Sequence, residues 1–453
     1  GLPKTLFGIA ALLLLVVSAL GMFFSKAPLT SLFFSDVAAE KFSMLVLGLA
    51  LMGVAGSVFR TYKEAGAALL IFLFSAGIGA LLTLVQLLFG VSAFGVISQF
   101  AGGIDFNVIG TLNSLALFYG TCMIMGFGIL LSPMFREWRR WVQYGMYASV
   151  GFFFLDLLFI NFRTAWIALF GAGILLSGFV FASVRAGRGE EESSFIKDWR
   201  SWPVIGLLVV SAVLIMVRTP VFGGLEVLPE VSPAFSTTMG MARAVWDEGA
   251  LRVLFGSGPA TFGLEWAHVR SPALNNTIFW DTRFNQGFSW IATTLVTGGL
   301  AGAAALVLFL GVVCVVCMRA LLKRGGGDAS FGMSVVLGLV FLVIAAFLYP
   351  ANLTLMILFF LLTGMLTGLL AIRLTKLSDV GVTGSVPLSG TGEGGAADMS
   401  AVPSTSGAIG SGDMAIRDTG DGDMLQSSRN IGSGIGWWDI EERMFAFKKS
   451  WAV

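Results

Sequence analysis

Histidine, cysteine and charged residues are all scarce in this sequence of 453 residues, which contains one histidine and three cysteines. The cysteines, Cys122, Cys314 and Cys317, lie inside apolar stretches, so a disulfide framework is excluded. Cys314 and Cys317 are one helical turn apart, but neither a second cysteine pair nor a histidine lies near them in sequence. We interpret them as small packing residues, and we expect neither a metal nor another cofactor.

Charged residues make up only 12% of the chain, and the formal net charge is +1. Composition therefore gives no reason to expect nucleic acid or a strongly acidic substrate as a partner. Hydrophobic residues make up 56% of the chain, which is more than a soluble globular domain usually contains. The composition indicates an integral membrane protein whose main partner is the lipid bilayer.

The apolar runs predict an all-α, polytopic membrane helix bundle over residues 1–376, with about ten spans, because a crossing helix needs roughly 20 apolar residues. The stretch from Val91 to Phe100 is too short to cross, and we interpret it as interfacial or re-entrant. The predicted spans are 5–24, 42–59, 66–89, 109–131, 141–160, 164–183, 203–217, 289–317, 331–349 and 352–372.

Lysine and arginine are concentrated in alternate loops, which predicts the orientation by the positive-inside rule. The opposite short loops hold little beyond Lys26, Lys41 and Arg163. Both termini are therefore predicted to be cytoplasmic, and the segment from Arg218 to Phe288 is predicted to be the one long outer loop. The predicted cytoplasmic residues are Arg60, Lys63, Arg136, Arg139, Arg140, Arg185, Arg188, Lys197, Arg200, Arg319, Lys323, Arg324, Arg373 and Lys376.

The segment after Lys376 is rich in Gly, Ser, Thr and Asp, and we expect residues 377–436 to be a disordered tail. Residues 437–453 mix aromatic and charged side chains and could lie on the inner membrane surface. A cloning-derived extension or a fragment of a further domain is the alternative interpretation of these last residues.

Two charged residues lie near the outer ends of the fifth and sixth predicted spans. Arg163 opens the sixth span and is either an interfacial anchor or a fixed guanidinium that binds a phosphate of a membrane-borne substrate. Asp156 lies seven residues earlier, and it would share a face with Arg163 if one helix continued through Asn161. A structural ion pair and a carboxylate that activates an acceptor hydroxyl are the two interpretations of Asp156.

The outer loop contains several features that could carry chemistry. Residues Ser236 to Glu248 predict a helix, with Ser236 and Thr237 as N-caps and an apolar stripe at helical spacing. A turn containing Gly256 and Gly258 follows, and it either is structural or presents backbone amides to an anion. Beyond it lie the candidate base His268 with Glu265 and Arg270 beside it, and then Arg283.

Three segments together resemble the O-antigen ligase and polymerase superfamily of multispanning membrane glycosyltransferases. They are Arg-Thr-Ala-Trp from Arg163 to Trp166, Gly-Ser-Gly-Pro-Ala-Thr-Phe from Gly256 to Phe262, and Leu-Val-Thr-Gly-Gly-Leu-Ala-Gly from Leu295 to Gly302. The resemblance implies transfer of a glycan from an undecaprenyl-diphosphate carrier to an acceptor on the outer face of the cytoplasmic membrane. It also implies that Arg163 lies near the diphosphate of this lipid-linked glycan.

The chain departs from the family pattern at two expected catalytic positions, where Phe288-Ser289 and Thr238 replace His-Asn and an arginine. Either His268 and Arg243 act from shifted positions, with Glu265 sharing the role of base, or this branch has lost or changed its chemistry. A non-catalytic protein that binds or assembles cell-surface glycans is therefore the alternative function. A lipid-linked glycan transporter is a weaker alternative, because the spans contain few polar residues.

The orientation can be tested by cysteine-accessibility labelling. A cysteine placed at Ser194, in a predicted cytoplasmic loop, should react with a membrane-impermeant maleimide only after the membrane has been opened. Labelling of this cysteine from outside intact cells would contradict the predicted topology.

Overall fold

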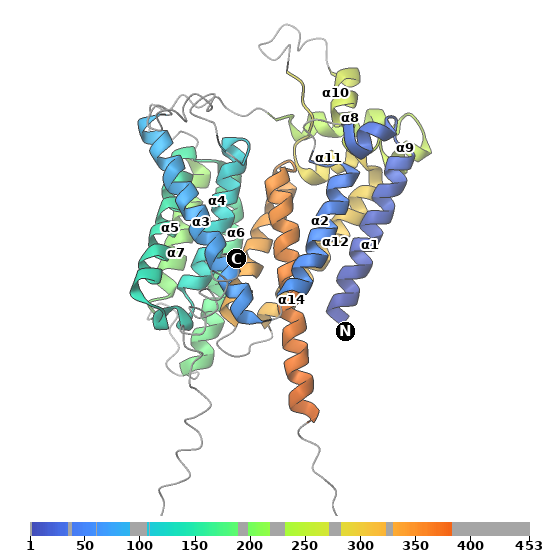
Figure 1. The fold of residues 1–453 in the computed structure, drawn as a ribbon. Helices are drawn as coiled ribbons and strands as arrows, with labels where there is room; N and C mark the ends of the chain where they lie inside the picture. Colours follow the sequence, from blue (N-terminus) through green and yellow to red (C-terminus); the bar gives the residue numbers. More distant parts are fainter. Residues whose placement is uncertain are drawn as a thin grey trace, which may run out of the picture. The chain divides into compact units, whose positions relative to one another are not determined.

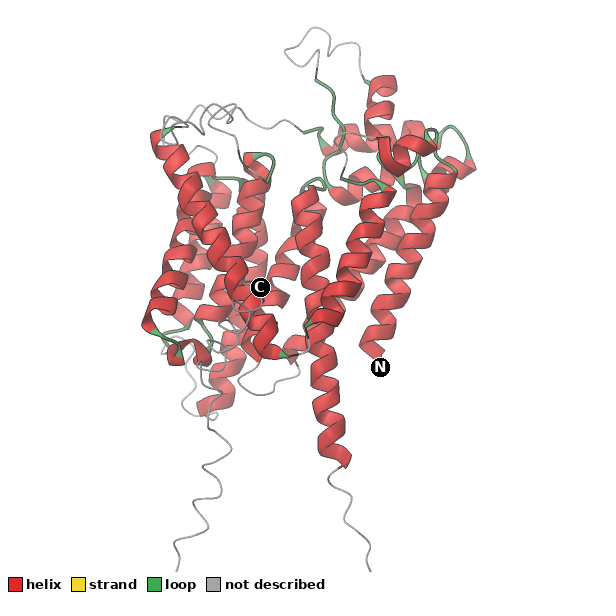
Figure 2. Cartoon of the chain, in the orientation of Figure 1, coloured by secondary structure: helices red, strands yellow, loops and turns green. Residues whose placement is uncertain are grey.

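The computed structural model describes residues 2–34, 39–59, 61–90, 107, 109–188, 198–217, 232–270, 282–322 and 329–382. The regular elements in these ranges are all helices (Figures 1 and 2). The chain divides into two units, Gly1–Val386 and Pro387–Val453. The first six residues of the predicted tail, 377–382, instead belong to the last helix, Leu353–Val382. The rest of the tail, the second unit and the stretch from Val91 to Phe100 lie outside the described residues.

In the described part of the chain, eight helices are long and apolar enough to cross a bilayer. Two further apolar helices, α2 (Phe42–Val58) and α7 (Ser201–Met216), are shorter. The all-helical membrane fold is therefore confirmed, while ten crossings stay a prediction because they depend on α2 and α7. The eight long helices are α1 (Leu2–Phe23), α3 (Tyr62–Phe89), α4 (Leu112–Leu130), α5 (Arg140–Ile160), α6 (Arg163–Arg188), α12 (Gly299–Leu322), α13 (Ala329–Leu348) and α14 (Leu353–Val382).

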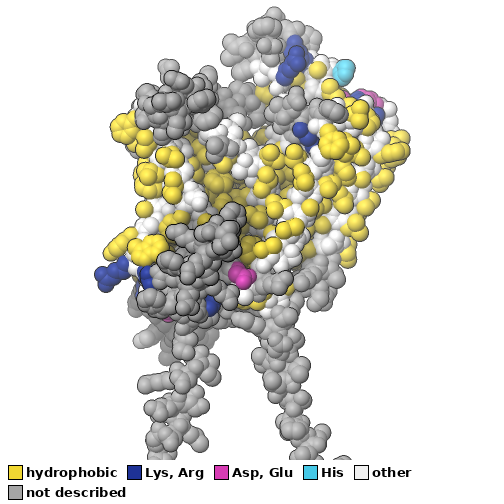
Figure 3. All heavy atoms as spheres, in the orientation of Figure 1, with side chains coloured by type: hydrophobic (Ala, Val, Ile, Leu, Met, Phe, Trp, Pro, Cys, Tyr) yellow, Lys and Arg dark blue, Asp and Glu magenta, His cyan; other side chains and the backbone are white. Residues whose placement is uncertain are grey.

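Helices α4 and α13 form the centre of the bundle, and they pack directly against each other. The glycine positions explain their close contact, since Gly120 of α4 faces the ring of Phe341 and Gly128 faces Ser334. The outer helices instead expose large apolar side chains such as Ile71, which is 62% exposed. On the face drawn in Figure 3, hydrophobic side chains cover the flanks of the helices, and charged side chains lie toward their ends. This distribution suits a helical surface in contact with lipid.

The predicted span 289–317 is not one continuous helix. It consists of the short helix α11 (Trp290–Thr297) and of α12, and the two are separated at Gly298. Gly299 has a φ of 65°, a backbone conformation that favours glycine. Apolar periodicity did not predict this break, because the residues on both sides of it are equally apolar.

Three short helices lie in the outer loop: α8 (Phe235–Trp246), α9 (Ala250–Phe255) and α10 (Phe262–Val269). The predicted helix over 236–248 is present as α8, but its N-cap is Ala234 without a side-chain hydrogen bond, so the predicted caps Ser236 and Thr237 are wrong. The sequence analysis did not predict α9 and α10. A small apolar core joins α8 and α10 to α11, and it consists of Met241, Ala242, Val245, Phe262, Trp266 and Val296.

Helix α2 is held against α14 by small residues at close approach. A Cβ added to Gly364 of α14 would clash with the carbonyl of Met52, and one added to Gly368 would lie 3.1 Å from the carbonyl oxygen of Gly56. This spacing of glycines four residues apart is a common device for helix packing in membranes, where close backbone contact replaces the hydrophobic effect. The contact therefore holds a helix that is itself short for a span.

We expect Gly364→Leu to separate α2 from α14 and to lower the apparent Tm of the detergent-purified protein. Gly311→Leu in α12 is the matched control, because a Cβ at Gly311 meets no atom within 4 Å. The expected loss is about 1–3 kcal/mol, the usual cost of overpacking. Equal Tm values for the two variants would show that this contact does not stabilise the protein.

Candidate functional site

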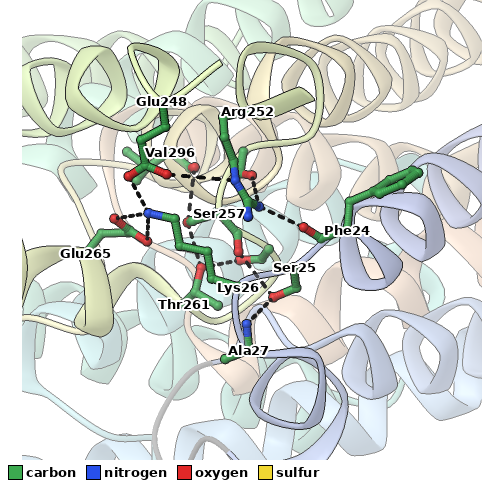
Figure 4. Close-up of polar contacts among 12 residues, drawn as sticks. Phe24, Ser25, Lys26, Ala27, Glu248, Arg252, Ser257, Thr261, Glu265 and Val296 are labelled. Atoms are coloured by element: carbon green, nitrogen blue, oxygen red, sulfur yellow. Dashed lines mark hydrogen bonds and ion pairs between the residues drawn. The ribbon is translucent and has the colours of Figure 1, made fainter. Parts of the chain in front are cut away.

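The outer loop is attached to the end of α1 by a cluster of charged residues (Figure 4). Lys26, three residues beyond α1, forms a hydrogen-bonded ion pair with Glu248 and a second ion pair with Glu265 of α10. Its Nζ lies 3.0 Å and 3.1 Å from the two carboxylate oxygens of Glu265. The side chain of Lys26 is 27% exposed, whereas that of Glu265 is only 2% exposed. The buried carboxylate therefore depends on this ammonium group for its counter-charge.

The pKa of Lys26 reflects this arrangement. Partial burial alone would lower it, but hydrogen bonds and charge from Glu248 and Glu265 outweigh burial and raise the pKa above its usual value. Lys26 is therefore a fixed cation at neutral pH. Nearby, the Arg252 guanidinium donates to the carbonyl oxygen of Phe24 at 2.7 Å, which adds a second link between α1 and the loop (Figure 4).

The turn from Gly256 to Gly258 joins the loop to the break between α11 and α12. The amides of Ser257 and Gly258 donate to the carbonyls of Val296 and Thr297, at 3.2 Å and 2.8 Å. A Cβ on Gly256 would lie 2.6 Å from the amide nitrogen of Gly299, so the two backbones are in direct contact. In this conformation the amides of the turn are engaged with the protein itself, which supports the structural interpretation of Gly256 and Gly258 over anion binding.

The predicted catalytic residues of the loop are not arranged as a single constellation. Glu265 is buried and paired with Lys26, while His268, on the same helix, is exposed (Figure 3). Arg243 on α8 is exposed as well. Of the two predicted binding arginines in the loop, Arg270 is half-buried and Arg283 is exposed. The ion pair with Lys26 occupies Glu265, so this carboxylate is poorly suited to act as a base together with His268.

Arg163 and Asp156 are separated by a break in the helix. Helix α5 ends at Ile160, and Asn161 adopts a left-handed conformation with a φ of 45°. One helix does not continue through Asn161, so the helical spacing does not place Asp156 and Arg163 on one face. Arg163 is exposed at the first position of α6, whereas Asp156 is fully buried, and neither of its oxygens has a hydrogen-bond partner among the described residues.

A half-buried glutamate that was not singled out from the sequence lies on another part of the predicted outer side. Glu40, just before α2, has an Oε1 atom that is fully buried and has no hydrogen-bond partner among the residues the structure describes. Burial raises the pKa of Glu40 to about 8. The sequence around Glu40 contains no motif that marks it, and the walls that distant elements supply cannot be read from this segment.

Glu40 and Lys41 both line a cavity of about 60 Å³ on the predicted outer side. Residues of α1, α2, α11, α12 and α14 form its walls, together with Pro259 from the glycine turn. A cavity of this size can hold the reacting groups of a substrate but not a whole glycan. A second cavity of about 30 Å³ adjoins it, since Trp290 and Met356 line both.

The second cavity extends toward the start of α6. Tyr349 lines it and forms an edge-to-face contact with Phe162, the residue before Arg163, with ring centroids 5.6 Å apart. Tyr349 also hydrogen-bonds through its hydroxyl group to Thr111 at the start of α4. Aromatic contacts and shared cavity walls thus connect the Glu40 region with the end of α6 that carries Arg163.

Within the described ranges, no group of three or more His, Cys, Asp or Glu side chains is placed to hold a metal ion. No protein-family model matches the chain, and no curated protein matches it significantly. Fold and composition define only the class of protein, a multi-pass helical membrane protein. Its activity must be inferred from the residues themselves.

We expect Lys26→Met to destabilise the outer loop, because it leaves the Glu265 carboxylate buried without a counter-charge. The expected loss of unfolding free energy is about 1–3 kcal/mol, measured as a lower apparent Tm in detergent. The double variant Lys26→Met/Glu265→Gln should regain part of this loss.

Glu248→Gln serves as the control for this ion pair. The Glu248 side chain is 44% exposed, and the pair it forms should contribute no more than about 1 kcal/mol. If Lys26→Met and Glu248→Gln lower the Tm equally, the pair with Glu265 does not anchor the loop.

Proposed function

We propose that this protein is a membrane glycosyltransferase that moves a glycan from an undecaprenyl-diphosphate carrier to an acceptor on the outer face of the membrane. The observation that carries this proposal is the Glu40 carboxylate, which faces a cavity that also contains Lys41. Transfer of a glycan to a hydroxyl group requires a base for the acceptor proton and positive charge for the departing diphosphate. The cavity offers one group of each kind.

Glu40 is assigned the role of general base. Its Oε1 has no partner among the described residues, so the acceptor hydroxyl can donate to it without first breaking a protein hydrogen bond. With a pKa of about 8, the carboxylate is a stronger base than an ordinary glutamate, and a useful fraction of it is ionised near neutral pH. Lys41, the only other charged residue among the described residues that line the cavity, is its neighbour in the sequence.

Arg163 is assigned to the diphosphate of the carrier. It is exposed at the start of α6, where a guanidinium can offer two parallel hydrogen bonds to a phosphate and remains charged at all relevant pH values. The likeness of Arg163–Trp166 to the ligase and polymerase signature supports this role. His268 remains available to contact the acceptor at the loop surface, because it is exposed.

The alternative is a protein that binds or assembles cell-surface glycans without transferring them. The engagement of Glu265 by Lys26 favours this alternative, because it removes a base that the sequence suggested. The two functions differ in their dependence on Glu40. A transferase needs an ionisable group at this position, whereas a binding protein does not.

We expect the initial rate of transfer by reconstituted protein to rise with pH and to have its midpoint near pH 8. A base acts in its ionised form, and the ionised fraction of Glu40 increases as the pH passes through its pKa of about 8. Glu40→Gln should lower the rate by about 10²–10⁴-fold, the usual contribution of a general base, and should abolish this pH dependence. Glu137→Gln, an exposed carboxylate elsewhere in the chain, is the matched control and should change neither.

Arg163→Lys provides a second arm of the same assay, because it keeps the charge but loses the planar guanidinium. Transfer should fall sharply while the Tm and the yield stay near those of the unaltered protein. Full transfer by Glu40→Gln would remove Glu40 from the mechanism. If the unaltered protein binds lipid-linked glycan but transfers nothing to any acceptor tested, the binding function is the correct one.

A further inference from the structure

A third cavity, unrelated to Glu40, lies between α4, α5 and α7. It has a volume of about 410 Å³, within the range of pockets that hold small organic ligands. Its walls are apolar or aromatic and include Phe127 of α4, Phe154 of α5 and Leu207 of α7. Two glycines, Gly151 and Gly206, form part of these walls, and a Cβ on either would meet no atom within 4 Å. Because glycine has no side chain, these two positions help to create the space.

One end of this cavity lies where α4 ends and α7 begins. Leu130 and Leu131 line it at the end of α4, and Trp199 and Pro203 line it at the start of α7. Sequence reasoning predicts that these helix ends face the cytoplasm, because the adjoining loops are rich in arginine. The cavity then lies at the depth of the inner leaflet, where a lipid chain rather than water would fill an apolar space.

The end near Trp199 carries positive charge. The Arg136 guanidinium carbon lies 4.4 Å from the centroid of the Trp199 ring, a cation–π arrangement that places an exposed cation beside the cavity wall. Arg200 follows Trp199 directly, and its Nε is buried without a hydrogen-bond partner among the described residues. Two acidic residues lie nearby in sequence: Asp198 accepts a hydrogen bond from the Arg200 amide, and Glu137 is exposed.

We propose that this cavity binds one acyl chain of an anionic phospholipid, whose phosphate lies against Arg136 and Arg200. Three features support this occupant over a neutral lipid or a sterol: the apolar walls, the predicted depth, and the Arg136 guanidinium on the Trp199 ring, with Arg200 next to Trp199 in the sequence. Arginine is well suited to phosphate because its planar group can donate two parallel hydrogen bonds. The site is separate from the proposed glycan chemistry and does not depend on it.

The experiment compares binding of phosphatidylglycerol and phosphatidylcholine with identical chains to the detergent-purified full chain, by native mass spectrometry. The unaltered protein should retain phosphatidylglycerol preferentially. Arg136→Gln should weaken phosphatidylglycerol binding about fivefold, the effect expected for one basic residue near a membrane surface, and should leave phosphatidylcholine binding unchanged. The matched control is Arg319→Gln, which removes an exposed arginine from the last turn of α12.

A second pair of variants tests the apolar part of the site. Gly206→Leu should fill the cavity and weaken retention of both lipids, while Gly311→Leu, on a surface with equal free space, should have no effect. The Tm of each variant shows whether it is folded. The proposal is overturned if both lipids bind equally to the unaltered protein. It is also overturned if folded Gly206→Leu and Gly311→Leu retain phosphatidylglycerol equally. Either result would mean that lipid contacts the protein without a specific site.

Discussion

The attachment of the long loop to the helix bundle depends on the direct backbone contact between Gly256 and Gly299. This contact brings the loop turn against the break between α11 and α12, and side chains larger than hydrogen would separate the two segments. Once the turn is in place, the Ser257 carbonyl accepts a hydrogen bond from the amide of Lys26, which fixes the chain just beyond α1. Lys26 is thereby positioned to neutralise Glu265, so the charged cluster follows from the backbone contact.

The same contact accompanies hydrogen bonds that satisfy the polar groups of the turn. The amides of Ser257 and Gly258 and the hydroxyl groups of Ser257 and Thr261 are all hydrogen-bonded within the protein. Satisfied polar groups suit a segment that lies against apolar helix ends, where an unpaired donor would be costly. At Glu40, in contrast to this turn, a carboxylate oxygen has no hydrogen-bond partner among the described residues.

The sequence predicted those features of the fold that depend on residues close together in the chain. Apolar runs indicated the long helices, and helical spacing indicated α8, because burial on one face leaves a regular repeat. Features that depend on distant segments were not predicted. The break at Gly298 requires the turn at Gly256 as a partner, and the burial of Glu40 requires walls supplied by α11, α12 and α14. The resemblance directed attention to Glu265 and His268, but pairing with Lys26 gives Glu265 a structural role.

The two proposed sites need charged residues of different kinds, one that titrates near neutral pH and one that does not. A proton acceptor must change its charge near neutral pH, and a glutamate does so when burial raises its pKa, as at Glu40. A site that holds a lipid phosphate needs charge that does not titrate, and arginine supplies it on the opposite predicted side of the membrane. Glutamate in the cavity on the predicted outer side and arginine beside the apolar cavity on the predicted inner side therefore each match their proposed task. Exchanging the two residue types would remove the titration from one site and the permanent charge from the other.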